Sequence, residues 1–203
     1  MDQTQSFYNM HADEFEQKTR SLQNIEWINS FCELLPSKGH ILDIGCAYGR
    51  DATTFVKKGF QTTGIDYSTT MIEKARKSVP EADFSVQDIR EMKFTDQTFS
   101  GVWASAILLH VPKNDIPKIL ETIHRILTAS GILFIGVYRG EGEGMITDAR
   151  YADAQKYYAY FSEDELRQLL AQAGFTVLKL VSREPNSYES KPIIELLARK
   201  TEV

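Results

Sequence analysis

Short apolar runs and apolar residues at helical spacing alternate along most of the chain. Apolar runs rich in β-branched residues predict buried strands at 40–46, 60–66, 82–87, 99–105 and 132–138. Between them, apolar residues spaced three and four apart predict helices at 51–58, 69–78 and 114–127. Strands that alternate with helices predict a parallel sheet with right-handed crossovers and helices on both faces.

The two ends of the chain depart from this alternation. Residues 6–20 and 25–35 predict an N-terminal helical arm, which either packs its aromatic side on the main domain or lies over the site as a flap. A polar, glycine-rich loop at 139–150 and an aromatic segment at 151–161 precede a helix that starts at a Ser162–Glu165 capping box. Residues 175–182 and 192–199 predict two strands joined by a turn too short for a helical crossover, so this pair is expected to be antiparallel.

Length and composition indicate one domain over residues 1–203, with an arm or lid at 1–38 and a catalytic core at 39–203. The 203 residues are 42% hydrophobic, and 23 basic against 28 acidic residues argue against nucleic-acid or membrane partners. Apolar runs fall well short of the ~20 residues of a spanning helix, and the two cysteines suggest no disulfide framework. We therefore expect a cytoplasmic protein that is a monomer or a homodimer.

The segment 40–51 is a buried strand that turns through small residues into a helix. Such a turn exposes backbone N–H groups where a ligand can approach the main chain. Ligands of open parallel sheets bind at the carboxyl ends of the strands, so the residues that end each predicted strand are candidates. They are Asp43, Gly45, Cys46, Ala47 and Gly49 for the first strand, Asp66 and Tyr67 for the second, Asp88 and Ile89 for the third, and Ser105 for the fourth.

The chemistry of these residues suits an adenine nucleoside. Asp66 can accept hydrogen bonds from both hydroxyls of a ribose, although an acid at this position is often only a helix cap. Tyr67 and Met71 can flank a flat base, with a buried helix residue as the alternative for Met71. Asp88 can accept from an exocyclic amino group while the backbone N–H of Ile89 donates to a ring nitrogen.

The dinucleotide NAD is the first rival ligand. Its fingerprint is G-x-G-x-x-G, whereas here the pattern is Asp43-x-Gly45-x-Ala47-x-Gly49, with the third small residue one position early. An acid two residues before Gly45 is a poor neighbour for a pyrophosphate. It suits a cationic sulfonium ligand and its amino group better.

Read together, these segments resemble class I S-adenosylmethionine-dependent methyltransferases, and within them the small bacterial enzymes that act on small molecules. The similar segments are 41–49, with Ala47 where glycine is usual, 64–68 for the ribose, 87–89 for the adenine, 99–105 for the fourth strand, and 131–135 and 166–175 for the later framework. The resemblance implies an α/β fold: a doubly wound, seven-stranded, mostly parallel sheet with an antiparallel last strand. It also implies S-adenosylmethionine as the cofactor, with Tyr8 and Arg50 approaching its methionine carboxylate; the alternative for Arg50 is a surface salt bridge.

The expected function is methyl transfer to a small-molecule acceptor. The alternatives are a non-catalytic S-adenosylmethionine-binding protein and an RNA or protein methyltransferase. His110 is the best candidate for a general base because it follows the fourth strand and titrates near neutrality, although a His at such a position more often caps or packs the loop before Pro112. No Cys/His cluster in the sequence suggests a metal site.

Overall fold

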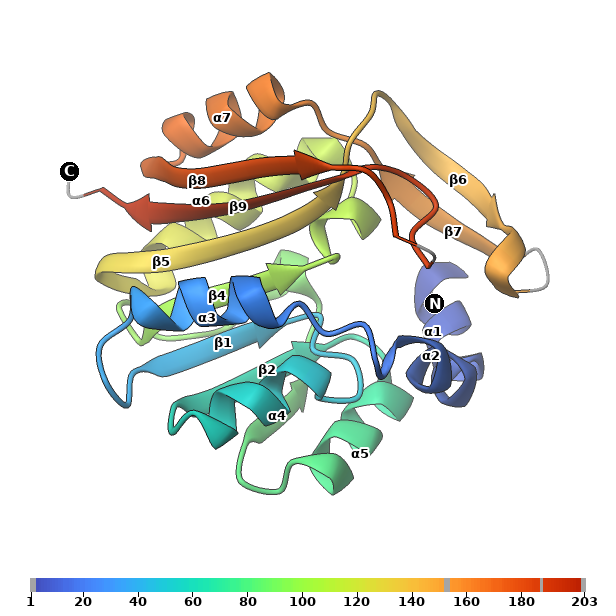
Figure 1. The fold of residues 1–203 in the computed structure, drawn as a ribbon, viewed down its shortest axis with the longest axis horizontal. Coiled ribbons are helices and arrows are strands. Elements are labelled where there is room, and N and C mark those ends of the chain that lie inside the picture. Colours follow the sequence, from blue (N-terminus) through green and yellow to red (C-terminus); the bar gives the residue numbers. More distant parts are fainter. Residues whose placement is uncertain (1–2, 152–153, 187, 202–203) are drawn as a thin grey trace.

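The computed structural model describes residues 3–151, 154–186 and 188–201. A seven-stranded sheet with the order β3-β2-β1-β4-β5-β9-β8 runs through the molecule (Figure 1). Its strands are β1 (His40–Ile44), β2 (Gln61–Asp66), β3 (Asp83–Val86), β4 (Phe99–Ser105), β5 (Leu127–Tyr138), β8 (Phe175–Arg183) and β9 (Ile193–Lys200). The first five are parallel, and β9 runs antiparallel to both of its neighbours. The predicted fold class, including the reversed last strand, is confirmed.

Helices cover both faces of the sheet (Figure 1). They are α1 (Gln3–Met10), α2 (Ala12–Thr19), α3 (Ile25–Glu33), α4 (Arg50–Lys57), α5 (Thr69–Ser78), α6 (Ile116–Ile126) and α7 (Glu163–Gln172). One core cluster packs α3 against the sheet through Phe31, Ile41 and Trp103. A second packs α6 and α7 against the opposite face, which the neighbouring strand residue Leu42 enters. Because successive strand residues point to opposite faces, one apolar strand supplies both layers.

Two local sequence signals are found in the expected places. The Ser68 side chain accepts a hydrogen bond from the Met71 N–H at the start of α5. Ser162 and Glu165 form a capping box at the start of α7. Each satisfies backbone donors that a helix end leaves unpaired, so these helices begin where their caps stand.

The segment after β5 differs from its prediction. A glycine-rich loop and an aromatic segment were expected, but β6 (Glu143–Asp148) and β7 (Ala154–Ala159) pair as an antiparallel hairpin outside the large sheet. Most side chains of β6 are exposed, whether they are polar or, like Met145 and Ile146, apolar. The segment therefore lacks the alternation of apolar and polar residues that marks a half-buried strand. The loop prediction is therefore wrong for residues 143–148.

The N-terminal arm lies beside this hairpin (Figure 1, right). It contains two short helices, α1 and α2, and α1 packs between β7 and α5. Phe7 is buried there, and Thr4 Oγ1 accepts a hydrogen bond of 3.1 Å from the Tyr157 N–H of β7. The arm thus connects two parts of the chain that are distant in sequence.

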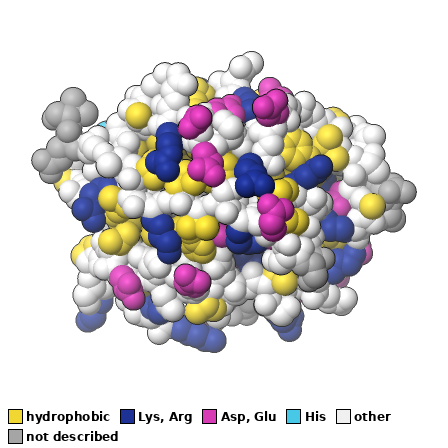
Figure 2. Space-filling view, turned by 45° about the horizontal axis from the view of Figure 1, so that its top comes forward, with side chains coloured by type: hydrophobic (Ala, Val, Ile, Leu, Met, Phe, Trp, Pro, Cys, Tyr) yellow, Lys and Arg dark blue, Asp and Glu magenta, His cyan; other side chains and the backbone are white. Residues whose placement is uncertain are grey.

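The outer surface carries mixed side chains. Figure 2 shows basic, acidic and hydrophobic side chains interspersed across one face of the molecule. Over the residues that the structure describes, none of the helices is both long and apolar enough to cross a membrane.

Candidate functional site

A cavity of about 540 Å³ opens at the carboxyl ends of β1, β2, β4 and β5. Its volume lies within the range of small-molecule sites. The wall includes nearly all of the residues singled out from the sequence: Tyr8, Asp43, Gly45, Cys46, Ala47, Arg50, Asp66, Tyr67, Asp88, Ile89, Ser105 and His110. Gly49 and Met71 are not part of the cavity wall, and Met71 is fully buried against Ala12 and Tyr48. Its position fits the alternative of a packed helix residue.

The turn after β1 is built from left-handed backbone conformations. Gly45, Ala47 and Gly49 have φ angles of +71°, +47° and +84°. A Cβ on Gly45 would lie 2.9 Å from the Cβ of Ile107, so this position has no room for a side chain. Ala47 pays some strain to adopt a conformation that favours glycine. The result is a tight turn whose main chain forms part of the cavity wall.

Asp66 holds this turn to the end of β2. Its Oδ2 accepts a hydrogen bond of 3.0 Å from the Ala47 N–H, and its Oδ1 accepts one of 2.8 Å from the Ser68 N–H. Burial raises the pKa of Asp66 to about 6, so the group is largely ionised at neutral pH. A carboxylate can accept about four hydrogen bonds, so Asp66 keeps acceptor capacity for a ligand hydroxyl.

Asp43 carries an unpaired polar atom at the base of the turn. Its side chain is buried, and Oδ2 finds no hydrogen-bond partner among residues 3–151, 154–186 and 188–201. Burial and the negative charge of Asp51 raise its pKa well above the ordinary range. A buried acceptor without a partner is costly, so a ligand that brings a donor or a positive charge would be favoured here.

Arg50 forms an ion pair and also lines the cavity. Its Nε and Nη2 donate to the two carboxylate oxygens of Asp51 at 2.8 and 3.1 Å. Asp51 also accepts a hydrogen bond of 3.0 Å from the Trp103 indole. The predicted salt bridge therefore exists, but it is largely buried at the cavity and fixes the guanidinium there.

Asp88 is engaged by its own neighbour. The backbone N–H and Nε of Arg90 each donate to Asp88 Oδ1 at 2.9 Å. Although burial favours the neutral acid, these hydrogen bonds lower the pKa of Asp88. The carboxylate is thus held charged at the cavity wall, beside the backbone of Ile89.

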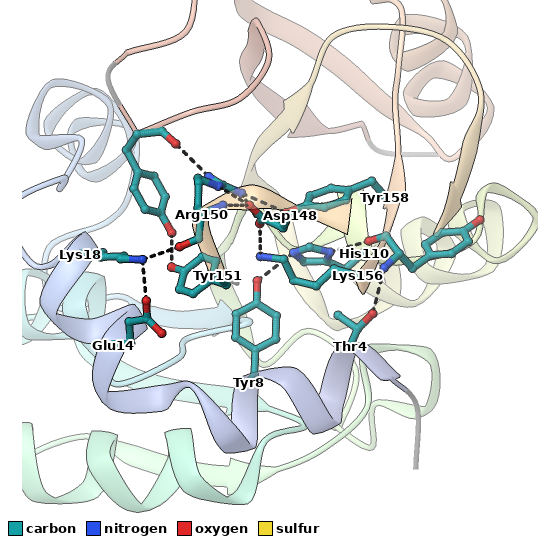
Figure 3. Close-up of polar contacts among 12 residues, drawn as sticks. Thr4, Tyr8, Glu14, Lys18, His110, Asp148, Arg150, Tyr151, Lys156 and Tyr158 are labelled. Carbon is teal, nitrogen blue, oxygen red and sulfur yellow. Dashed lines mark hydrogen bonds and ion pairs between the residues drawn. The ribbon is translucent and has the colours of Figure 1, made fainter. Parts of the chain in front are cut away.

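His110 is linked to the N-terminal arm (Figure 3). Its Nδ1 lies 2.7 Å from the Tyr157 carbonyl oxygen, and its Nε2 lies 2.9 Å from the Tyr8 hydroxyl. A carbonyl only accepts, so Nδ1 carries the proton and Nε2 accepts from Tyr8. Burial and the positive charge of Lys156 lower the pKa of His110 to about 3. The imidazole is neutral, and its one nitrogen lone pair that can accept is used by the Tyr8 hydroxyl. In this arrangement His110 orients Tyr8.

The hairpin brings a charged cluster to the far end of the cavity. Arg150 donates to the two oxygens of Asp148 at 2.8 and 2.7 Å, and the Lys156 ammonium lies 2.6 Å from Asp148 Oδ2 (Figure 3). Lys156 is only 1% exposed. Arg150, Lys156 and Tyr158 line the cavity, and sequence reasoning did not place the first two there.

Aromatic rings surround the Lys156 ammonium. Its Nζ lies 4.3 Å from the ring centre of Phe7 and 4.7 Å from that of Tyr151. The rings of Tyr8 and Tyr158 are each 5.6 Å away. The negative faces of these rings stabilise a positive charge. The one sequence signal that could have revealed this cluster is the placement of Asp148, Arg150 and Lys156 among tyrosines.

A match to known proteins decides the family. Residues 16–180 match the family described as methyltransferase domain. The chain belongs to this family. It is a class I S-adenosylmethionine-dependent methyltransferase domain, as the motifs of the sequence implied.

Curated relatives of this methyltransferase domain include enzymes of small molecules. An O-methyltransferase of Pyrenophora dematioidea is 30% identical over 158 residues, which cover 73% of this chain and 58% of the relative. A trans-aconitate 2-methyltransferase of Variovorax paradoxus is 29% identical over 145 residues, which cover 69% of this chain and 55% of the relative. The chain spans about three-fifths of the length of the first curated relatives it matches.

Solved structures share the fold at lower sequence identity. A SAM-dependent methyltransferase of Methanosarcina mazei has a TM-score of 0.77 at 21% identity, covering 85% of this chain and 97% of that one. The 1,6-didemethyltoxoflavin-N1-methyltransferase of Burkholderia thailandensis, solved with 1,6-didemethyltoxoflavin and S-adenosylhomocysteine, has a TM-score of 0.68 at 20% identity. It covers 98% of this chain and 91% of that one.

The turn of this methyltransferase domain fits the family's cofactor. S-adenosylmethionine carries a sulfonium charge and an amino group, and Asp43 Oδ2, which has no partner among the described residues, is an acceptor in the cavity wall that would suit them. The Asp66 carboxylate in the same wall would suit the two ribose hydroxyls. A metal is a separate question: across the described residues, no group of three or more His, Cys, Asp or Glu side chains is placed to hold one.

Proposed function

We propose that this domain transfers a methyl group from S-adenosylmethionine to a small-molecule acceptor. The observation that carries the proposal is the buried, unpaired Asp43 oxygen beside the Asp66 carboxylate, both at one cavity. When bound, the sulfonium supplies an activated methyl group. Asp43 would hold the amino end of the cofactor, Asp66 its ribose, and Arg50 its carboxylate, a group that guanidinium binds well.

Residues at the far end of the cavity support a small acceptor. The arm helix α1 and the hairpin β6–β7 both border this end, through Tyr8, Arg150, Lys156 and Tyr158. Walls from two elements can align an acceptor and exclude water, which are the main requirements once the methyl group is activated. The small-molecule methyltransferases among the relatives agree with this size of acceptor.

A general base is needed only if the acceptor atom keeps its proton until transfer. His110 would serve poorly in the arrangement seen, because its Nε2 already accepts from Tyr8 and its pKa is about 3. We therefore propose that His110 acts as a positioning residue for Tyr8, with the acceptor entering already deprotonated or nucleophilic.

Calorimetry with S-adenosylhomocysteine tests the cofactor site. Asp66→Ala should weaken binding by more than tenfold, because ribose hydroxyls lose charged acceptors. Asp83→Ala is the matched control, since Asp83 is an exposed carboxylate on the neighbouring strand β3. Equal affinity of wild type and Asp66→Ala, or binding of NAD in place of S-adenosylhomocysteine, would contradict the assignment.

Methyl transfer itself is tested with a labelled methyl donor and pooled metabolite extracts. Label should appear in a small molecule and not in added RNA or protein. Persistent lack of transfer by a protein that binds the cofactor would favour a non-catalytic binding protein. The expectation of a cytoplasmic monomer or homodimer is tested by cell fractionation and by size-exclusion chromatography with light scattering.

A further inference from the structure

Two cations, the buried Lys156 and the partly buried Arg150, share one carboxylate at the hairpin end of the cavity. Arg150 and Lys156 both pair with Asp148, whose side chain is 5% exposed. One negative charge cannot balance two positive ones, and removal from water makes the imbalance costly. This end of the cavity therefore carries an excess of about one positive charge before any ligand arrives.

The surroundings of Lys156 show that the excess is only partly relieved. Burial lowers the pKa of Lys156 to about 8 even though Asp148 favours its charged form. The other charges acting on it, from Arg150 and Lys18, are also positive. The four aromatic rings and the neutral His110 complete its environment.

Nearby carboxylates of the cavity are engaged elsewhere. Glu189 and Glu195 accept hydrogen bonds from Arg183 at 2.6–3.0 Å, on the side where β8 and β9 meet the cavity. Glu195 also accepts from the Asn24 amide. They therefore form a separate ion-pair group and do not pair with Arg150.

The wall around Arg150 also has a flat, apolar component. The rings of Tyr138 and Tyr158 lie 5.7 Å apart with an angle of 30° between their planes. Both tyrosines and Tyr188 line the cavity together with Arg150. Rings in this arrangement offer their faces and edges to a planar ligand.

From this geometry we propose that the Arg150–Lys156 end of the cavity binds a carboxylate of the methyl acceptor, carried on a flat apolar body. The inference deepens the proposed function and rests on it. The ligand carboxylate supplies the missing negative charge, and the tyrosine rings contact its apolar part. A cationic acceptor of the same shape is repelled by this excess charge, and a neutral one gains no charge–charge attraction from it.

Proton linkage provides a readout that does not depend on catalysis. A bound carboxylate stabilises the charged form of Lys156, so its pKa rises and the complex takes up protons. In the protein without ligand the pKa of Lys156 is about 8, so at pH 8 about half of the Lys156 side chains carry the proton. Binding of the carboxylate therefore takes up at most about half a proton per ligand at this pH. Calorimetry in buffers of different ionisation enthalpy measures this number directly.

The probes are benzoate and its neutral analogue benzamide, titrated into protein saturated with S-adenosylhomocysteine. Benzoate should bind at least tenfold more tightly than benzamide and with proton uptake at pH 8. Lys156→Met and Arg150→Gln should each reduce the preference for benzoate over benzamide to below threefold. Lys156→Met should also abolish the proton uptake. Arg139→Gln is the matched control, because Arg139 pairs with Glu184 and Ser182 away from the cavity wall.

The outcomes separate the two proposals. If S-adenosylhomocysteine fails to bind wild type, the proposed function fails whatever the probes do. If it binds but benzoate shows no advantage over benzamide, including the case in which neither binds, the carboxylate site is refuted. Circular dichroism and retained S-adenosylhomocysteine affinity of each variant establish that a lost preference is not unfolding.

Discussion

At the scale of single residues, the site is governed by which polar groups have partners and which do not. His110 has both ring nitrogens occupied, and Asp66 accepts from the backbone N–H groups of Ala47 and Ser68. Asp43 has a buried oxygen without a partner in the described part of the chain. Satisfied groups fix the shape of the cavity, and the unsatisfied one marks where a ligand must supply a donor.

The burial of neutral His110 predicts an acid-dependent loss of stability. Its pKa is about 3 in the folded protein and near 6.5 when unfolded, so below pH 6.5 the unfolded chain binds more protons. Above pH 6.5 the burial of His110 does not lower the free energy of unfolding. At pH 5 it lowers that free energy by about 2 kcal/mol. Urea unfolding of wild type and His110→Asn at pH 7.5 and pH 5 measures the difference.

His110→Asn keeps an amide donor near the Tyr157 carbonyl and removes the titrating ring. Wild type should therefore lose about 2 kcal/mol more than the variant between the two pH values. The comparison is needed because Asp66, with its raised pKa of about 6, acts in the opposite direction over the same range. Equal losses in the two proteins would show that His110 does not remain neutral.

Residues that end parallel strands could be identified from sequence, because the sheet brings those ends to one edge. Asp43, Asp66 and Asp88 meet at the cavity for this reason. Arg150 and Lys156 could not be identified in this way, since they stand on a hairpin outside the sheet. Met71 was misplaced toward the cavity because helical spacing alone does not tell a core position from a lining one.

At the scale of elements, α1 joins the two halves of the site. Its Gln5 side chain donates to the Tyr67 carbonyl at 2.6 Å, just after the end of β2. Its Tyr8 contacts His110, and its Phe7 covers Lys156 of β7. A short helix is marginal alone, so its order depends on these tertiary contacts.

Phe7→Ala should release α1 from the hairpin. Phe7 is 2% exposed and packs edge-on against Tyr151 at 4.9 Å, and truncation of such a ring costs about 3–5 kcal/mol where it packs. Hydrogen exchange should accelerate at least tenfold in α1 and β7 while β4 stays unchanged. Met10→Ala is the control on the same helix, because Met10 is 74% exposed. Uniform acceleration through the sheet would instead indicate that α1 is part of the global core.

The hydrophobic pattern predicted the strands of the central sheet well. Both faces of this sheet are buried, so its strands are continuous apolar runs in the sequence. β5 still begins earlier than expected, at Leu127 instead of Ile132, since its polar start pairs with β4 across a bulge. Polar residues at that end gave no strand signal. Elements that depend on tertiary contacts, such as β6 and α1, showed the weakest patterns.

At the scale of the whole molecule, the cavity lies between the strand ends, the arm and the hairpin. A ligand that binds the folded state alone stabilises it by an amount that grows with the logarithm of the ligand concentration. At one hundred times its dissociation constant, S-adenosylhomocysteine should add about 2.7 kcal/mol to the free energy of unfolding.

Thermal unfolding measures this gain. For a chain of 203 residues it corresponds to a rise in Tm of roughly 5–10 °C. Adenosine alone, which lacks the amino acid end that Asp43 and Arg50 would hold, should give a smaller rise at equal concentration. An equal rise with adenosine would mean that those two residues contribute little to binding.

The hairpin β6–β7 has a further consequence for how such a protein changes over generations. It is inserted between two framework elements, β5 and α7, and among the described residues its two strands pair with each other and not with the central sheet. Insertions, deletions and charge changes in this hairpin alter the Arg150–Lys156 end of the cavity most directly, whereas Asp43 and Asp66 stand on strands of the central sheet. Under the proposed function, acceptor preference can therefore diverge between descendants through this hairpin while the residues proposed to hold S-adenosylmethionine stay the same.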